Sequence, residues 1–317
     1  MTHDSAATRM RAAGSALLAT LDPVARVAVA HAFDDEPARR WIEYRPRPRP
    51  GACLADLDPA ARKAAHRLLA TGLSRHAYAQ AMTVVALEEV LDRDEGWRRG
   101  RHSGDYWVAV FGDPGRDDLW SWRFEGHHLS VTMTVRDDRV SPAPVFLGAN
   151  PARVDHAGRT VCAPLAPEED LGHALLAALD PAGRSAAIVA DEAPTDIHSG
   201  TRPRTDRLEP LGLSAGRLDG TARQTLDHLV TLYLDRLPEP VAAAEAARIA
   251  AGDLHFAWAG PPGPGGRHYY RIQGDDLLIE YDNTSPDGNH AHTVLRRPDS
   301  DFGDDVLAAH HTDTPHP

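Results

Sequence analysis

The spacing of apolar residues changes from a helical period to a strand period at Tyr106, and this change limits the possible folds more than any other feature. Before it, residues 74–93 carry apolar side chains at the spacing of an amphipathic helix. After it, apolar segments separated by turn signals predict an antiparallel meander of four strands, at residues 106–111, 119–124, 129–135 and 140–147.

The same change recurs later in the chain. Helical patterns at 167–179, 180–190, 221–236 and 239–251 surround a predicted surface loop at 191–220, and strands are predicted at 255–259, 268–273, 277–281 and 290–295. We therefore expect a single α+β domain whose antiparallel meanders share one sheet or barrel, flanked by two helical blocks. Its blocks are helical 1–95, strands 105–148, helical 165–251, strands 254–296 and a polar tail 304–317.

Three similar segments, residues 21–26, 57–62 and 179–184, each place an aspartate before a proline. Because this pair is a common helix start and the flanking sequences differ, we interpret them as independent helix starts rather than as a repeat. Between the first two lies Arg45-Pro-Arg-Pro-Arg-Pro50, where the prolines predict an extended arm. The arm is either a solvated strap across the surface or a segment whose arginines reach an anionic ligand or another subunit.

Charge and cysteine content limit the partners and the compartment. The formal net charge of −12 argues against a nucleic-acid-binding surface, which needs basic side chains to neutralise phosphates. The two cysteines, Cys53 and Cys162, have no metal or redox spacing, and residues 1–20 lack the apolar core of a signal peptide, so we expect a cytoplasmic protein. No segment has the apolar length of a membrane span, and the oligomeric state stays open.

Histidine is unusually frequent, with 18 in 317 residues, and one pair follows Gly126 directly. Large apolar residues occupy even positions before this glycine and odd positions after it, so the buried parity changes at His127 and His128. Either a β-bulge at the glycine or a plain hairpin turn explains the change.

A second pair, His290 and His292, lies on one face of a predicted strand, where two imidazoles can converge on one cation. With His127 or His128 they would complete three histidine ligands for a divalent metal ion, either zinc, iron or copper. The alternative is that these histidines are surface residues or partners of buried carboxylates.

Two carboxylates near these pairs are candidates for proton transfer. Glu125 precedes Gly126, and Glu280 interrupts an apolar strand on the same face as Asp282. A salt bridge to Arg271 is the alternative role of Glu280. Polar and aromatic side chains around them suit a pocket for a small organic substrate, namely Trp258, His268, Tyr270, Arg271, Gln273 and Asn289.

Several separated segments resemble, in the same order, the mainly bacterial, uncharacterised family called domain of unknown function 3500. They lie at residues 124–130, 146–151, 190–194, 255–260, 268–274, 279–284, 289–292 and 301–303. The resemblance runs from Trp41 to His310 and implies a single family unit, but it supplies no reaction. One departure follows the second histidine pair, where this chain has Leu295-Arg-Arg297.

These features lead to three functional hypotheses. The first is a metal-dependent enzyme in which a metal-bound water hydrolyses a small organic molecule and Glu125 or Glu280 moves the proton. The second is an iron- or copper-dependent oxidase or oxygenase at the same histidines. The third is a metal-free module that binds a small ligand.

Overall fold

The computed structural model describes residues 5–305, apart from 251, 264 and 286. Two halves follow each other, and each begins with helices and ends with strands. The first contains α1 (Ala6–Thr20), α2 (Pro23–Val29), β1 (Ala30–His31), α3 (Glu36–Arg39), β2 (Ala52–Cys53), η1 (Leu54–Asp56), α4 (Pro59–Gly72), α5 (Arg75–Asp94), β3 (Tyr106–Phe111), β4 (Leu119–Gly126), β5 (Leu129–Arg136), β6 (Arg139–Ser141) and β7 (Val145–Ala149).

The hairpin of β8 (Val154–His156) and β9 (Arg159–Cys162) connects the halves and was not predicted from the sequence. The second half contains α6 (Ala166–Ala178), α7 (Pro181–Ala187), β10 (Ile188–Ala190), β11 (Leu213–Ser214), η2 (Ala215–Arg217), α8 (Gly220–Leu234), α9 (Glu239–Ile249), β12 (His255–Ala259), β13 (His268–Gly274), β14 (Leu277–Asn283), β15 (Ala291–Arg296) and η3 (Asp301–Gly303).

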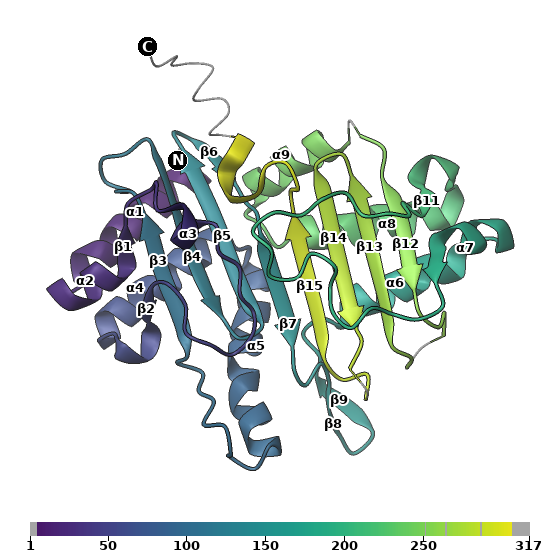
Figure 1. Cartoon of the computed structure of the whole chain (residues 1–317), viewed down its shortest axis with the longest axis horizontal. Coiled ribbons are helices and arrows are strands. Elements are labelled where there is room, and N and C mark those ends of the chain that lie inside the picture. The colour runs from purple at the N-terminus through teal and green to yellow at the C-terminus, as the bar shows by residue number, and fades with distance from the viewer. Residues whose placement is uncertain (1–4, 251, 264, 286, 306–317) are drawn as a thin grey trace.

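Apart from β8 and β9, the strands of the described residues form one thirteen-stranded, mostly antiparallel sheet (Figure 1). Its path is β1-β3-β4-β5-β7-β15-β14-β13-β12-β10, and β2, β6 and β11 pair beside it. The halves join where β7 and β15 pair antiparallel. Because β1 and β10 are separate edges, the sheet is open, and the barrel that the sequence left as an alternative is excluded.

The two halves share one pattern of strand pairing. Val110 lies opposite Trp122 in the first half, and Trp258 lies opposite Tyr270 in the second. Both residues of the second pair come 148 positions after their equivalents in the first pair. In each half a short helix leads into an edge strand that runs parallel to the first meander strand: α2 into β1 beside β3, and α7 into β10 beside β12. The chain therefore contains two copies of one arrangement.

This arrangement corrects the interpretation of the Asp-Pro segments. Residues 21–26 and 179–184 lead into α2 and α7, which occupy equivalent places, and Asp22 and Asp180 cap them by accepting the backbone N–H of Ala25 and Gly183. These two segments are a repeat, and the prediction of independent helix starts is wrong for them. The segment at 57–62 leads into α4. Its counterpart α8 begins at Gly220 directly after Asp219, so the segment has no Asp-Pro partner.

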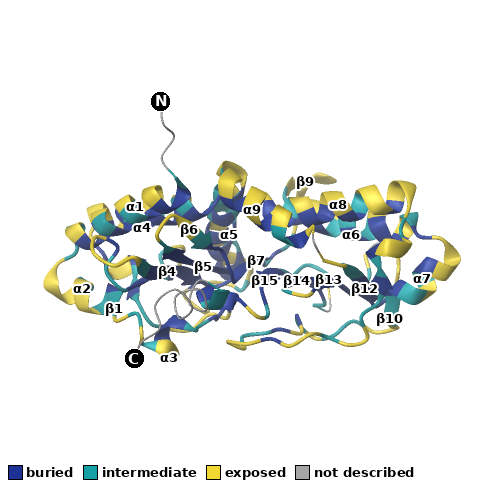
Figure 2. Cartoon of the chain, turned by 90° about the horizontal axis from the view of Figure 1, so that it is seen from above, coloured by how far each residue is buried: buried dark blue, intermediate teal, exposed yellow. Residues whose placement is uncertain are grey.

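The long helices cover one face of the sheet, and extended segments together with the short helix α3 cross the other (Figures 1 and 2). We call residues 40–51 the first strap and residues 195–212 the second strap. Because extended backbone outside a sheet still needs hydrogen-bond partners, buried side chains of the sheet supply them. Glu125 accepts from the N–H of Glu43 at 2.8 Å, and Glu280 accepts from the N–H of His198 at 2.6 Å.

The arginine-proline arm lies in the first strap and is only partly solvated. The side chains of Arg45 and Arg47 are 48% and 53% exposed, whereas that of Arg49 is fully buried beside Glu125, at 3.5 Å. The arm therefore crosses the sheet surface with Arg45 and Arg47 facing outward and Arg49 facing the sheet.

One apolar cluster between the helices and the sheet contains residues from both halves, including Trp120, Trp122 and Trp258. The predicted strand at 140–147 is divided into β6 and β7 because Pro142 and Pro144 lie between them and lack the N–H that a ladder needs. Over the described part of the chain, no helix combines the length and apolar character that crossing a membrane requires.

Candidate metal centre

His127 and His128 form the turn between β4 and β5, in which Gly126 pairs with Leu129. A hairpin with two turn residues places even positions of one strand opposite odd positions of the other, which explains the change of apolar parity without a bulge. A Cβ at Gly126 would lie 2.1 Å from the Tyr106 ring, so only glycine fits there. His128 adopts a φ of 60°.

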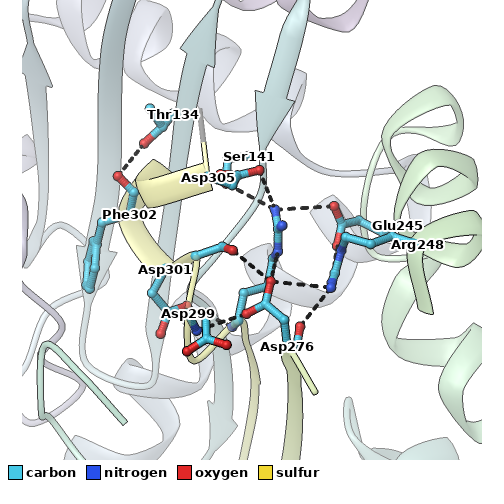
Figure 3. A network of polar contacts seen from close by, with 11 residues as sticks. Thr134, Ser141, Glu245, Arg248, Asp276, Asp299, Asp301, Phe302 and Asp305 are labelled. Atoms are coloured by element: carbon cyan, nitrogen blue, oxygen red, sulfur yellow. Dashed lines mark hydrogen bonds and ion pairs between the residues drawn. The ribbon is translucent and has the colours of Figure 1, made fainter. Parts of the chain in front are cut away.

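The matching turn of the second half, between β13 and β14, carries Asp275 and Asp276 instead. Asp276 accepts a hydrogen bond from Ser300 Oγ at 2.7 Å and contacts Arg297 Nε at 3.2 Å and Arg248 Nη1 at 3.4 Å (Figure 3). This turn is therefore fixed by an ionic network, whereas the histidine turn faces a pocket.

The central strand pair brings the second histidine pair to the first. His292 on β15 lies opposite Gly148 on β7, and the Gly148 N–H donates to the His128 carbonyl at 2.7 Å. A Cβ at Gly148 would lie 2.9 Å from His128 Cδ2 and 3.0 Å from His292 Cδ2. The absent side chain of Gly148 thus gives the two rings their space.

Three of the four predicted histidine ligands converge. The Nε2 atoms of His128 and His290 are 2.8 Å apart, and the rings of His290 and His292 have centroids 4.6 Å apart. One ring nitrogen from each of the three lies within 4.8 Å of the others. They line an open pocket of about 530 Å³, which we call the histidine pocket.

Two carboxylates lie behind His292. Its Nδ1 is 3.2 Å from Asp282 on β14 and 3.1 Å from Asp196 of the second strap, and Asp196 also accepts from the Tyr44 hydroxyl at 2.8 Å. Burial opposes protonation of His292, but the two carboxylates outweigh it and raise its pKa to about 10. Burial raises the pKa of Asp282 to about 6 against the opposing charge of His292.

The other two rings of the cluster favour the neutral form. Burial, together with the positive charge of His292, lowers the pKa of His290 to about 3. Burial and the neighbouring histidines hold the pKa of His128 well below its ordinary value. Neutral imidazoles keep a lone pair free, and this is the form that binds metal ions.

His127 points toward the helical layer rather than toward the three-histidine cluster. Its Nδ1 is 2.5 Å from Glu88 on α5 and 3.3 Å from Arg101. Its ring lies against that of His128, with centroids 3.7 Å apart. Glu88, His127 and His128 also form a second group whose ligand atoms lie within 4.8 Å of one another.

The two glutamates predicted as proton carriers do not reach the histidines. Glu125 is fully buried and contacts the first strap, Ser130 and Arg123, and Glu280 is fully buried beneath the second strap, where it accepts from Tyr269 at 2.9 Å. Neither lines the histidine pocket. Their positions fit the anchoring of the straps, because each accepts strap N–H groups that would otherwise be buried without a partner.

The predicted substrate-binding residues are also dispersed. Arg271 donates to the carbonyl of Pro210, and Gln273 exchanges two hydrogen bonds with Leu208, so both hold the second strap. Asn289 exchanges two hydrogen bonds with the backbone of Arg153. The others, Trp258, His268 and Tyr270, lie on the helical side of the sheet beside His173 and Tyr233.

Sequence reasoning missed Tyr44, Glu88 and Asp196. Glu88 had a signal, because it continues the buried face of α5 at the spacing of Ala81, Val84 and Leu91. Tyr44 and Asp196 lie in the straps, where no periodic pattern marks a residue as part of a site.

Comparisons with known proteins identify the chain only by family. No curated protein and no solved structure matches it. A family profile described as protein of unknown function, DUF3500, matches residues 3–304, which is nearly the whole chain. The chain therefore belongs to the DUF3500 family of proteins of unknown function.

Proposed function

We propose that the protein is a metal-dependent enzyme that acts on a small organic molecule, with the metal ion held by His128, His290 and His292. The observation that carries the proposal is the convergence of three ring nitrogens within 4.8 Å at the wall of an open pocket. Three protein ligands and an open position are the arrangement of catalytic zinc sites.

The distances fit an ion after a small adjustment. Zinc–nitrogen bonds of about 2.0–2.1 Å in a tetrahedral site hold two nitrogens about 3.3 Å apart. The Nε2 atoms of His128 and His290, now 2.8 Å apart, would therefore separate by about half an ångström. Asp282 and Asp196 would accept the Nδ1 proton of neutral His292, in the way that carboxylates commonly orient metal-binding imidazoles.

Hydrolysis is the reaction that this ligand set favours, because a bound zinc ion lowers the pKa of its water to near 7. Asp196 is the carboxylate best placed to accept a proton, since it lines the pocket and its side chain is 40% exposed. It takes the role that the sequence suggested for Glu125 or Glu280. The size of the pocket, about 530 Å³, suits a small organic substrate.

Two alternatives use the same residues. Three histidines also bind iron or copper, and the reaction would then be an oxygen-dependent oxidation. Without a metal, His292 is still held by hydrogen bonds to Asp196 and Asp282, and this network favours a module that binds a small ligand without turnover. The identity of the bound metal distinguishes the hydrolase from the oxidase or oxygenase, and the absence of metal favours the binding module.

The test is metal analysis of untagged protein purified without chelator, for the wild type and two variants. His290→Gln removes a ligand of the cluster, and His228→Gln is the matched control because His228 is exposed on α8. We expect the first variant alone to lose one equivalent of metal and to lose any hydrolysis of small ester and amide substrates. After chelator treatment, which removes the stabilisation by bound metal, both variants should have the Tm of the wild type. Equal metal content in both variants would refute the proposal.

A further inference from the structure

A second group of potential ligands lies on the opposite, helical face of the sheet. Glu169 and His173 are four residues apart on α6, so their side chains lie on one face of that helix. His268 begins β13 beneath them. The helix comes close to this strand, because a Cβ at Gly172 would lie 2.5 Å from the Tyr270 ring.

The three side chains converge, and one ring nitrogen of each histidine lacks a hydrogen-bond partner among the described residues. His268 Nε2 is 3.8 Å from Glu169 Oε1, and the rings of His173 and His268 have centroids 4.5 Å apart. One ligand atom from each residue lies within 4.8 Å of the others. The Nε2 atoms of both histidines are buried with no hydrogen-bond partner among the described residues, and His268 is fully buried.

The orientation of His268 leaves its lone pair toward Glu169 and His173. Its Nδ1 is 2.9 Å from the Gly266 carbonyl, which can only accept, so Nδ1 carries the proton and Nε2 the lone pair. The ring is fixed between Trp258 and Tyr281, with centroids 5.0 Å and 5.4 Å away and nearly parallel planes. A buried lone pair without a donor is costly, which points to an occupant such as a cation.

Comparison of the two halves shows that the fold does not require polar side chains at the position of His268 and Asn283. His268 lies opposite Asn283 in the second half, and the equivalent pair in the first half is Trp120 opposite Val135. The same positions thus hold an apolar pair in one copy and a polar pair in the other. Asn283 donates to Glu169 Oε1 at 3.3 Å, while its own Oδ1 is buried without a partner.

The group also has access to solvent. Glu169, His173 and Asn283 line a pocket of about 440 Å³ near the β8–β9 hairpin. Where the chain enters β15, Asn289 and Ala291 line this pocket, whereas His290 and His292 line the histidine pocket. Because neighbouring side chains along a strand point to opposite faces, the two pockets lie on opposite sides of the sheet.

We propose that Glu169, His173 and His268 form a second metal site, distinct from the three-histidine site. Two imidazoles and one carboxylate are the ligand set of hydrolytic zinc sites and of non-haem iron(II) sites, and both leave positions open for water or substrate. The open positions would face the 440 Å³ pocket, so the ligand would be a small molecule with an oxygen donor.

The experiment is titration of chelator-treated, full-length protein with Co²⁺, followed by visible absorption, and with Zn²⁺, followed by calorimetry. The variants are His173→Gln, Glu169→Gln and His290→Gln, with His228→Gln as control. His173 is chosen because it is only partly buried and tolerates substitution more readily than His268. Circular dichroism and Tm establish that each variant is folded.

We expect His173→Gln and Glu169→Gln each to lose one equivalent of bound metal, or to bind it at least tenfold more weakly. This expectation does not depend on whether the three-histidine site binds metal. The double variant with His290→Gln would then lose the metal of both sites. The proposal is overturned if His173→Gln and Glu169→Gln bind the same amount of metal, with the same affinity, as the control. Because each site has its own variant, failure of one leaves the test of the other intact.

Discussion

His292 lies between two carboxylates, and this environment sets its charge in the metal-free protein. Its pKa of about 10 in the folded protein exceeds the ordinary value of about 6.5. A raised pKa means that the folded state favours the protonated ring, so its stabilisation is fully present below about pH 6.5 and is lost as the pH rises through about 10.

We therefore expect the free energy of unfolding of chelator-treated protein to fall between pH 7 and pH 9. His292→Gln should remove up to about 1.4 kcal/mol per pH unit of this dependence. Asp282, with a pKa of about 6, is ionised throughout this range and does not add to the slope. Urea denaturation of both proteins at pH 7, 8 and 9 measures the difference. Parallel curves would show that His292 is neutral in the folded state.

Gly148 is the residue whose missing side chain makes the histidine cluster possible. We expect Gly148→Ala to push apart the rings of His128 and His292, to cost about 1–3 kcal/mol of stability and to weaken metal binding at that cluster at least tenfold. Gly104→Ala is a suitable control, because its Cβ would make only an ordinary contact of 3.5 Å with Ala55. Metal titration and thermal unfolding of both variants test this expectation. Unchanged metal binding in Gly148→Ala would show that the cluster does not depend on the missing side chain of Gly148.

At this scale the sequence predicts part of the site. The two-residue period of a strand is enough to place His290 and His292 on one face, and the parity change marks His127 and His128 as turn or bulge residues. It does not predict that Asp196 would join them, because a hydrogen bond between a strap and a strand has no periodic signature. Nor does it tell which of the two adjacent turn histidines joins His290 and His292.

Among the elements, the straps depend on buried carboxylates of the sheet. Glu280 accepts the N–H groups of His198 and Ser199, next to the pocket residue Asp196. The sequence marks Glu280 as unusual because it interrupts an apolar strand, but it cannot separate catalysis from anchoring. In the structure its oxygen atoms are occupied by the strap and by Tyr269.

We expect Glu280→Ala to cost about 1–3 kcal/mol, because it leaves two strap N–H groups buried without an acceptor. Limited proteolysis should then cut within residues 195–212 much faster than in the wild type. Glu280→Gln retains one acceptor oxygen and should show a smaller effect on both measurements. If Glu280→Gln instead abolished activity while the strap stayed protease-resistant, Glu280 would have a catalytic role.

Across the whole molecule, the sequence predicts most helices and strands but not their arrangement. Periodicity locates α5 and the meander strands because each is a long amphipathic or alternating segment. The pairing of β7 with β15, which turns two meanders into one open sheet, depends on contacts between strands that are about 145 residues apart. The repeat was missed for a related reason, since equivalent positions such as Trp120 and His268 share a place in the sheet but not a side-chain type.

The prediction of a single domain can be tested by cooperativity of unfolding. The two halves share five consecutive residue pairs between β7 and β15, and the main apolar cluster includes side chains of both, such as Leu147 and Ile279. Separating the halves would expose these backbone groups and apolar surfaces together, so we expect one transition. Hydrogen exchange measured by mass spectrometry in increasing urea should give the same midpoint for peptides from β4 and from β13.

Different midpoints for the two halves would mean that the shared sheet is not enough to couple them, and that each copy of the repeated arrangement is stable alone. A variant at the junction sharpens the test. Thr293→Val keeps the shape of the side chain but removes the hydroxyl that donates to the Leu147 carbonyl at 2.7 Å and accepts from Arg236. If the protein is a single cooperative unit, Thr293→Val lowers the unfolding midpoints of both halves equally, because stability lost at the junction is lost by the whole sheet.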